Sequence, residues 1–247
     1  MIHSLLKTKS SAKLIFLFSL ALFITACDKP IISTTSPNGS MNILGPILDI
    51  LKDPDRSRWI IKGSPTPELL KVVKLDSKQA LKLKNGGEKY LIIKPAQAPL
   101  LATPYMSWEW NMETPSDDQH PVRIIVGFQN GSEQNQTWIS SFIRFNKTLP
   151  MHNRELRLIW GKSALQRGTI ISNDSINKNM LISSFIVRGG QENTNSWWSE
   201  AVDLYDIYHR AWPKDDIEKT QITFIGFGVL PGNKSIASFI SNLRISR

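Results

Sequence analysis

The sequence predicts an all-β domain, built as a sandwich of two antiparallel sheets with one short helix. About a dozen short apolar or alternating segments follow one another from residue 59 onward. Turn-forming residues separate them, as in residues 64–67 (Ser-Pro-Thr-Pro) and 85–87 (Asn-Gly-Gly). Beyond residue 59, only residues 203–212 have the apolar spacing of an amphipathic helix. Such a pattern favours a sandwich, expected to be of the jelly-roll or galactose-binding-like kind.

The expected strands are brief in the first half of the chain and longer in the second. Those of the first half are residues 59–61, 70–75, 80–83 and 90–93. Those of the second half are residues 105–112, 122–128, 137–145, 155–160, 181–187, 222–229 and 236–245. Four apolar residues share one face of the helical segment 203–212, namely Leu204, Ile207, Tyr208 and Ala211. A further short helix is expected at residues 43–52, where Pro46 suits the first turn.

Residues 1–26 have the order of a secretory signal peptide. Three lysines precede the apolar run of residues 14–24, and small residues follow it. This run is much shorter than the roughly 20 residues that a membrane-spanning helix needs. A buried core helix is the other alternative, but the run lies near the terminus behind the lysines. The last residues before the expected cleavage, together with Cys27, read Ile-Thr-Ala-Cys and resemble the bacterial lipobox.

The resemblance to a lipobox implies that Cys27 receives a diacylglycerol thioether and becomes the acylated N-terminus. The alternative role for Cys27, the single cysteine of the chain, is that of an ordinary buried thiol. Several acyl chains hold a protein on a bilayer durably, whereas one chain holds it only marginally. Asp28 resembles the signal that retains enterobacterial lipoproteins in the inner membrane. We therefore expect a lipid-anchored protein that faces the periplasm, with the lipid bilayer as its first partner.

The remaining chain divides into a tether, residues 27–42, and a β-sandwich domain, residues 43–247. The tether is rich in Ser, Thr, Pro, Asn and Gly, as linkers are. Removal of the signal peptide leaves 27 basic and 21 acidic residues, a formal charge of +6. A basic exported protein is expected to meet an anionic envelope ligand rather than nucleic acid. The lysines between residues 71 and 94 form either a solvated edge or a surface for anionic headgroups.

Tryptophans are the first candidates for ligand binding, because the chain has eight of them. Trp108 and Trp110 point to the same face of their strand. There they either stack on a sugar ring or fill the space between the sheets, and at least one is expected in the core. Trp160 and Trp198 are further candidates.

Charged residues near these tryptophans are the second group of candidates. Asp117 and Asp118 precede the strand that carries Arg123, and Glu200 follows Trp198. They suit a hydroxylated or cationic ligand, or else form turns and surface ion pairs. A calcium site needs six or more oxygens, which no spaced acidic loop supplies, so no metal is expected. No cofactor is expected either. We expect Arg123 and Glu200 to lie close together as a pair.

Asp206 and His209 are weak candidates for catalysis. They are neighbours on the expected helix, and an acid beside a histidine is typical of a general base. However, no motif marks a nucleophile, and no second histidine has the spacing of a metal ligand. A surface helix with ion pairs, such as Asp206 with Arg210, is favoured.

Three stretches of residues 104–246 share the motif order of a known family. They are residues 106–110 with 117–118 and 122–128, residues 158–161 with 168–169, and residues 198–200 with 206–210. This order resembles the family catalogued as domain of unknown function 3047, a set of exported bacterial proteins. The resemblance implies export and a sandwich fold, and it brings no known activity. The chain departs from the family at Val202, in place of an arginine, and at residues 230–233, in place of an acidic loop.

The sequence as a whole favours a non-catalytic protein that binds an envelope carbohydrate or glycan. One alternative is a hydrolase or lyase of an envelope polymer, which requires two carboxylates about 5–10 Å apart across a cleft. Another alternative is a protein-interaction module of the envelope. A sandwich fold alone does not choose among them.

Overall fold

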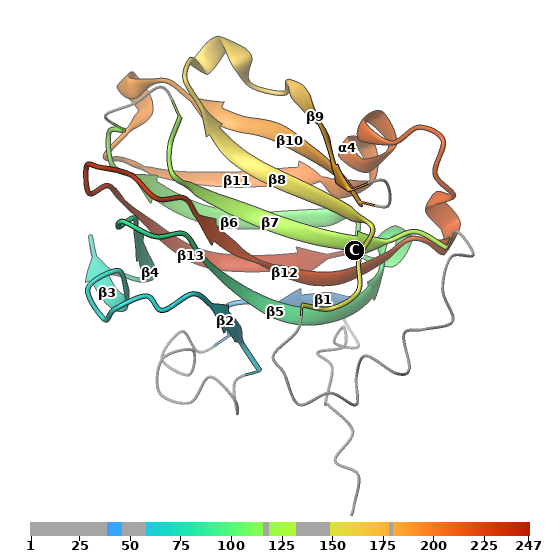
Figure 1. Ribbon diagram of the computed structural model, residues 1–247, viewed down its shortest axis with the longest axis horizontal. Helices are drawn as coiled ribbons and strands as arrows, with labels where there is room; N and C mark the ends of the chain where they lie inside the picture. Colours follow the sequence, from blue (N-terminus) through green and yellow to red (C-terminus); the bar gives the residue numbers. More distant parts are fainter. Residues whose placement is uncertain (1–38, 46–57, 116–118, 132–148, 178–179) are drawn as a thin grey trace, which may run out of the picture. The chain divides into compact units, whose positions relative to one another are not determined.

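The computed structural model describes residues 39–45, 58–115, 119–131, 149–177 and 180–247. These residues form two packed β-sheets and one short α-helix (Figure 1). The all-β sandwich that the sequence predicts is therefore confirmed. Several expectations lie wholly or mostly outside the described residues. They include the signal peptide at 1–26, the lipidation of Cys27, the sorting role of Asp28, the helix at 43–52 and the strand at 137–145.

The smaller sheet has six strands, and every pair in it is antiparallel. Its order is β11-β6-β13-β4-β3, with β1 paired to β13. The strands are β1 (Ser40–Asn42), β3 (Leu70–Leu75), β4 (Lys78–Lys84), β6 (Tyr105–Met112), β11 (Trp197–Asp203) and β13 (Ala237–Ser246). Because β1 belongs to the segment expected as a tether, the chain joins the sheet earlier than the sequence indicates.

The larger sheet has seven strands in the order β2-β5-β12-β7-β8-β10-β9. They are β2 (Ile60–Lys62), β5 (Tyr90–Pro99), β7 (Val122–Gln129), β8 (Arg154–Gly161), β9 (Ile170–Asn177), β10 (Met180–Gly189) and β12 (Gln221–Val229). The expectation of purely antiparallel sheets is wrong at one pair, because β8 and β10 run parallel. After β8 the chain forms the edge strand β9, and it then turns back to form β10 between β8 and β9. Because β10 is antiparallel to β9, it runs in the same direction as β8.

Alternating side chains place the core between the two sheets. In β6 the inward positions include Trp108 and Trp110, whereas Glu109 points outward. Strand β7 is buried on both faces, so its sequence, VRIIVGF, does not alternate. On the outer face of the larger sheet, Ile125 of β7 packs with Ile93 and Phe224 in a separate cluster.

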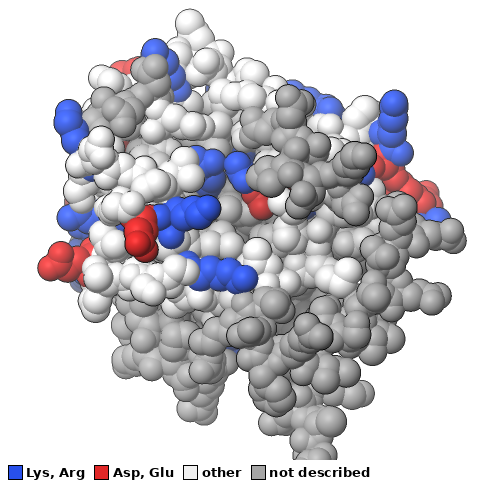
Figure 2. All heavy atoms as spheres, viewed as in Figure 1, with Lys and Arg blue, Asp and Glu red and all other residues white. Residues whose placement is uncertain are grey.

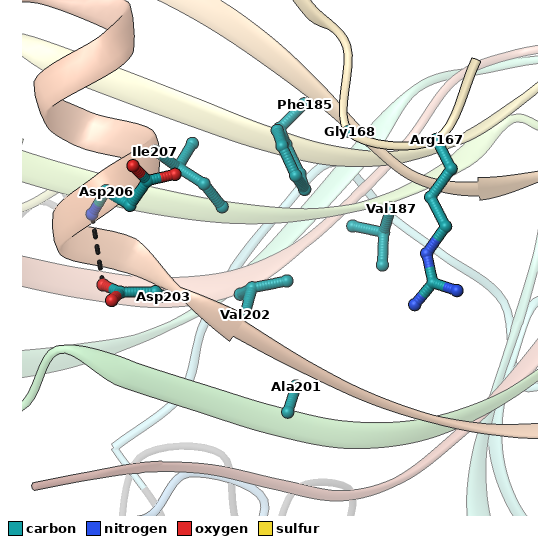
Figure 3. A pocket seen from close by; sticks show the side chains of 9 residues that line it. All are labelled: Arg167, Gly168, Phe185, Val187, Ala201, Val202, Asp203, Asp206 and Ile207. Atoms are coloured by element: carbon teal, nitrogen blue, oxygen red, sulfur yellow. Dashed lines mark hydrogen bonds between the residues drawn. The ribbon is translucent and has the colours of Figure 1, made fainter.

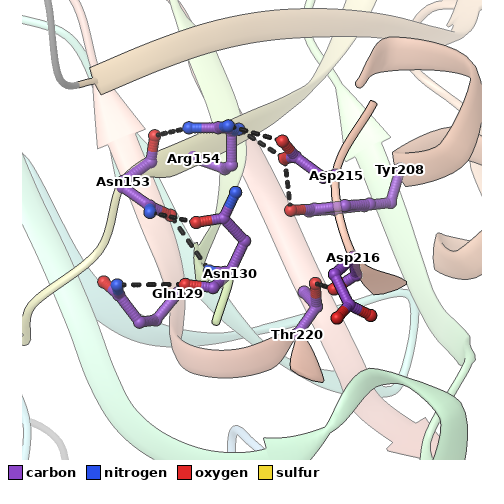
Figure 4. Close-up of polar contacts among 8 residues, drawn as sticks. All are labelled: Gln129, Asn130, Asn153, Arg154, Tyr208, Asp215, Asp216 and Thr220. Carbon is purple, nitrogen blue, oxygen red and sulfur yellow. Dashed lines mark hydrogen bonds and ion pairs between the residues drawn. The ribbon is translucent and has the colours of Figure 1, made fainter. Parts of the chain in front are cut away.

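The helix α4 (Leu204–Ala211) follows β11 directly and confirms the helical segment expected at 203–212. Asp203 caps it, because its carboxylate accepts a hydrogen bond from the backbone N–H of Asp206 (3.1 Å). Beyond the helix, the carboxylate of Asp215 accepts two hydrogen bonds of 2.6 Å from Arg154 of β8 and one of 2.8 Å from the hydroxyl of Tyr208 (Figure 4). Burial raises the pKa of Tyr208, so its hydroxyl stays protonated and donates. These bonds tie the helix to the larger sheet.

Candidate functional site

Three of the candidate tryptophans meet inside the sandwich. Trp108 and Trp110 pack edge to face with ring centroids 5.3 Å apart, and Trp110 packs in the same way against Trp160 of β8 at 5.5 Å. None of the three is more than 2% exposed. A buried aromatic side chain removes about 150–250 Å² from water, which stabilises the fold by roughly 4–6 kcal/mol at about 25 cal/mol per Å². Their ring surfaces are therefore taken up by packing of the core.

Glu200 of β11 is the charged residue of this cluster. Its side chain is 1% exposed, and its carboxylate accepts hydrogen bonds from Trp110 Nε1 (3.3 Å), Arg188 Nε (2.5 Å) and Arg167 Nη2 (3.3 Å). The guanidinium of Arg188 also lies 3.8 Å from the ring centroid of Trp198, whose indole N–H donates to a backbone carbonyl. A buried carboxylate is costly unless it is paired. These donors satisfy it, so Glu200 links the edges of the two sheets.

A cavity of about 210 Å³ opens beside this pair, at the edge of the sandwich where β10 and β11 face each other. Its walls combine apolar and charged side chains, and Figure 3 shows how they are arranged. The carboxylates of Asp203 and Asp206 lie on one side, and the guanidinium of Arg167 lies on the other. Between them lie Phe185, Val187 and Val202, and the rest of the lining consists of Gly168, Ala201 and Ile207.

Helix α4 supplies one wall of this edge pocket. Arg210 donates from Nη1 to the carboxylate of Asp206 (3.2 Å) and from Nη2 to the backbone carbonyl of Gly168 (2.9 Å). It therefore holds the helix and the segment before β9 together. Among the described residues, no hydrogen bond or ion pair joins His209 to Asp206, and the ring of His209 stacks on Tyr205 with ring centroids 6.4 Å apart. The favoured interpretation of a capped helix with an Asp206–Arg210 ion pair is confirmed.

The expected pair of Arg123 and Glu200 is wrong. Glu200 points into the sandwich and binds Arg188 and Arg167. Arg123 lies on β7 beside Ile125, which packs on the outer face of the larger sheet. The structure therefore brings Trp108, Trp110, Trp160, Trp198 and Glu200 together and leaves Arg123 apart from them. Asp117 and Asp118 lie outside the described residues.

Sequence reasoning missed three charged residues of the edge: Arg167, Arg188 and Asp203. A signal existed for Arg188, because an arginine within the apolar segment SFIVRGG needs a partner for its charge. Asp203 stands where a helix N-cap is expected, directly before the amphipathic segment. Nothing local marks Arg167, because only the packing of its segment against β11 brings it to Glu200.

A second cavity, of about 310 Å³, lies at the ends of β8 and β10 and is lined by Pro115, Trp160, Gly161, Lys162, Gly190, Gln191 and Glu192. In the described segments, no group of three or more His, Cys, Asp or Glu residues could hold a metal ion. Nor does any helix of those segments combine the length and hydropathy needed to cross a bilayer.

Comparisons with solved structures show distant likenesses. Endoglucanase 3 of family GH12 from Trichoderma harzianum is 14% identical, with a TM-score of 0.42 over 72% of this chain and 82% of that one. The family 12 xyloglucanase of Bacillus licheniformis is 10% identical, with a TM-score of 0.41 over 87% and 97%. A family 11 carbohydrate-binding module of Clostridium thermocellum, solved with a mixed-linked tetrasaccharide, is 9% identical, with a TM-score of 0.35 over 76% and 88%.

No curated protein sequence matches the chain. The family DUF3047, described as protein of unknown function, matches residues 57–227, which is more than half of the chain. The match begins and ends earlier than the block at 104–246 on which the resemblance rests. It includes all three motif stretches, and the chain therefore belongs to the DUF3047 family.

Proposed function

We propose that this protein is a bacterial lipoprotein whose β-sandwich binds an envelope glycan in the edge pocket. The observation that carries the proposal is the composition of this pocket. The carboxylates of Asp203 and Asp206 lie on one side of the cavity and the guanidinium of Arg167 lies on the other, with apolar side chains between them. The cavity is open at the edge of the sandwich. Binding pockets typically combine an apolar lining with a few convergent polar groups in this way.

A sugar ring matches the chemistry of the edge pocket. Its hydroxyl groups donate hydrogen bonds to the carboxylates of Asp203 and Asp206 and accept them from Arg167. Its C–H faces pack against Phe185 and Val202. The cavity is small, about 210 Å³, and it is open at the edge of the sandwich. The pocket therefore suits a single sugar unit at the end or on a branch of a glycan.

The engagement of the carboxylates favours binding over hydrolysis. Glu200, the most buried acid at the edge, has both oxygens occupied by arginines. Asp203 caps helix α4, and Asp206 is paired with Arg210. A glycosidase needs one carboxyl group free to give a proton and a second free to attack or to activate water. Each of these three carboxylates instead has a structural partner.

The membrane anchor is part of the proposal. Cys27 would carry the acyl chains, and Asp28 would retain the protein in the inner membrane, with the sandwich facing the periplasm. Globomycin treatment of producing cells tests this step, because it should leave a larger, unprocessed precursor. A mature N-terminus without lipid in mass spectrometry would contradict it.

The binding step is tested on an array of envelope glycans followed by isothermal titration of the best binder. Arg167→Gln removes the exposed guanidinium and is expected to weaken binding about tenfold, the loss of one charged hydrogen bond. Lys234→Gln, which removes an exposed charge in the loop before β13, is the matched control and should bind as the wild type does. Equal affinities of the two variants, or no glycan bound by the wild type, would refute the edge pocket as the site.

A further inference from the structure

The outer face of the smaller sheet carries a group of exposed and half-exposed cations. Side chains that alternate with the core positions, such as Phe239 of β13, point to this face, and the strand register extends it across β4 and β3. Its cations are Lys71, Lys78, Lys82, Lys84 and Arg244. They come from β3, β4 and β13, which are neighbours in the sheet. We call this surface the basic face.

Two cations of the basic face lie directly opposite each other. Lys71 of β3 and Lys82 of β4 are partners in the antiparallel register, so their Cβ atoms are about 4.5–5.5 Å apart. Like charges in such a pair destabilise a sheet. Asp76 lies in the turn between the two strands, at the other end of the hairpin. An anion held against the basic face would therefore relieve a repulsion that the fold itself leaves in place.

The acids on and beside the outer face of the smaller sheet have other partners. Glu109 of β6 lies 3.0 Å from Lys78 Nζ and accepts two further hydrogen bonds. Asp203 caps α4, and Glu113, directly after β6, accepts a hydrogen bond of 2.8 Å from a backbone N–H of β13. The cations that no acid of the described segments neutralises are Lys71, Lys82, Lys84 and Arg244.

Aromatic rings lie among these cations. Phe239 is half-exposed, and Lys82 Nζ lies 5.5 Å from its ring centroid. Trp197 of β11 is also half-exposed, with Lys78 Nζ 5.1 Å from its ring centroid. Protein surfaces that rest on a bilayer combine basic side chains for the headgroups with aromatic rings at the interface. The basic face has both components.

The chain enters the sandwich beside the basic face. Strand β1 pairs with the second half of β13, and β4 pairs with the first half, both on the side away from β6. Residues 28–39 separate Cys27 from β1, and a chain of this length spans at most about 45 Å. A lipid anchor at Cys27 would therefore keep this side of the sandwich close to the bilayer.

The outer face of the larger sheet has a different distribution of charge. Figure 2 views this side of the molecule and shows Asp and Glu side chains among the Lys and Arg side chains. On this face Arg157 of β8, which is opposite Ile125, donates a hydrogen bond of 2.6 Å from Nε to Glu155. Opposite charges thus neutralise each other there, which makes the basic face the better match for an anionic surface.

We propose that the basic face docks on the anionic headgroups of the lipid bilayer to which the protein is anchored. The need for an anion follows from the unneutralised cations, whereas the bilayer as its source rests on the anchor in the proposed function. The edge pocket lies at β11, which is the other edge of this sheet from β3, and it opens toward β10. Docking through β3 and β4 therefore leaves the edge pocket accessible.

Lysine footprinting of the full-length lipidated protein tests the proposal. The protein is bound to vesicles of phosphatidylcholine, with or without phosphatidylglycerol, and acetylation of each lysine is followed by mass spectrometry. Phosphatidylglycerol should slow the acetylation of Lys71 and Lys82 about threefold or more, and high salt should abolish the difference because it screens the charges. Lys214, an exposed residue after α4, is the internal control and should react equally in both kinds of vesicle.

A double substitution with a matched control tests the charges themselves. Lys71→Gln/Lys82→Gln should abolish the protection of Lys84 by phosphatidylglycerol, because each cation near an anionic bilayer strengthens binding about fivefold. Lys214→Gln/Lys219→Gln also removes two exposed charges and should keep the protection. In detergent, Lys71→Gln/Lys82→Gln should unfold at the urea concentration of the wild type or at a higher one, because the repulsion between the strands is gone.

Three outcomes would overturn the proposal. They are equal acetylation of Lys71 and Lys82 in the two kinds of vesicle, unchanged protection of Lys84 in Lys71→Gln/Lys82→Gln, and equal protection by polygalacturonate added to phosphatidylcholine vesicles. The last outcome would assign the basic face to a soluble acidic polysaccharide. Attachment of the protein to vesicles of phosphatidylcholine alone reports on the lipid anchor, so the anchor and the basic face can fail independently.

Discussion

His120 should make the protein less stable as the pH falls from 7.5 to 4.5. It lies directly before β7, is 1% exposed, and accepts a hydrogen bond at Nδ1 from the backbone N–H of Val122 (3.2 Å). Its Nε2 atom has no hydrogen-bond partner in the described segments. Burial lowers the pKa of His120 from 6.5 to about 4. Below pH 6.5 His120 is therefore protonated in the unfolded chain but stays neutral in the folded protein.

The size of the effect follows from the two pKa values. With a pKa of 6.5 unfolded and about 4 folded, the loss of stability is about 1.4 kcal/mol at pH 5.5. It grows to about 2.5 kcal/mol at pH 4.5 and vanishes above pH 7.5. The stabilisation is thus fully present above the unfolded pKa and is lost as the pH falls toward the folded one.

Urea unfolding followed by tryptophan fluorescence at pH 7.5, 5.5 and 4.5 measures this loss. The reference is His120→Asn, whose side-chain oxygen can still accept the bond from Val122 but does not titrate. Carboxylates with lowered pKa, such as Glu109 and Asp216, contribute equally to both proteins. The wild type should lose about 2–3 kcal/mol more than the variant over this range. Parallel pH dependence of the two proteins would refute the reasoning.

Three further substitutions, one of them with a matched control, test an ion pair, a close contact and a helix cap in the same unfolding assay. Glu200→Gln should cost about 3–5 kcal/mol, because it leaves buried positive charge unpaired, and a loss below 1 kcal/mol would contradict this. Gly127→Ala should cost about 1–3 kcal/mol, because a Cβ there would overlap the ring of Phe224, whereas Gly87→Ala, with open space around it, should be near neutral. Asp203→Ala should cost about 1 kcal/mol through the lost helix cap, and unchanged stability would argue against the cap.

The features that the sequence predicts well are those that depend on local pattern. The alternation of MSWEWNM places both tryptophans of β6 on one face, and the 3.6-residue spacing after Asp203 marks α4. Strand β9 escapes prediction because its sequence, IISNDSIN, is mostly polar and its pairing with β10 is what makes it a strand. The parallel pair of β8 and β10 depends on strand order, which no local pattern encodes.

The charged residues show the same division. Alternation with Trp198 and Val202 indicates that Glu200 points inward, but it does not identify Arg188 and Arg167 as partners. For Arg123 even the direction is hidden, because β7 is apolar on both faces. The sequence therefore does not predict which face of the sheet an arginine between two aliphatic residues points to.

The arginines of the larger sheet also differ in whether an acid neutralises their charge. Arg154 and Arg188 direct their Nε atoms at Asp215 and Glu200. The first pair joins β8 to the segment after α4, and the second joins β10 and β11, which belong to different sheets. Removal of either acid should therefore weaken the fold itself. Arg123 lies on the same sheet and is more deeply buried, but its Nε and Nη2 atoms have no hydrogen-bond partner in the described segments. Because no described acid pairs with that charge, Arg123→Met is expected to unfold at the same urea concentration as the wild type or at a higher one.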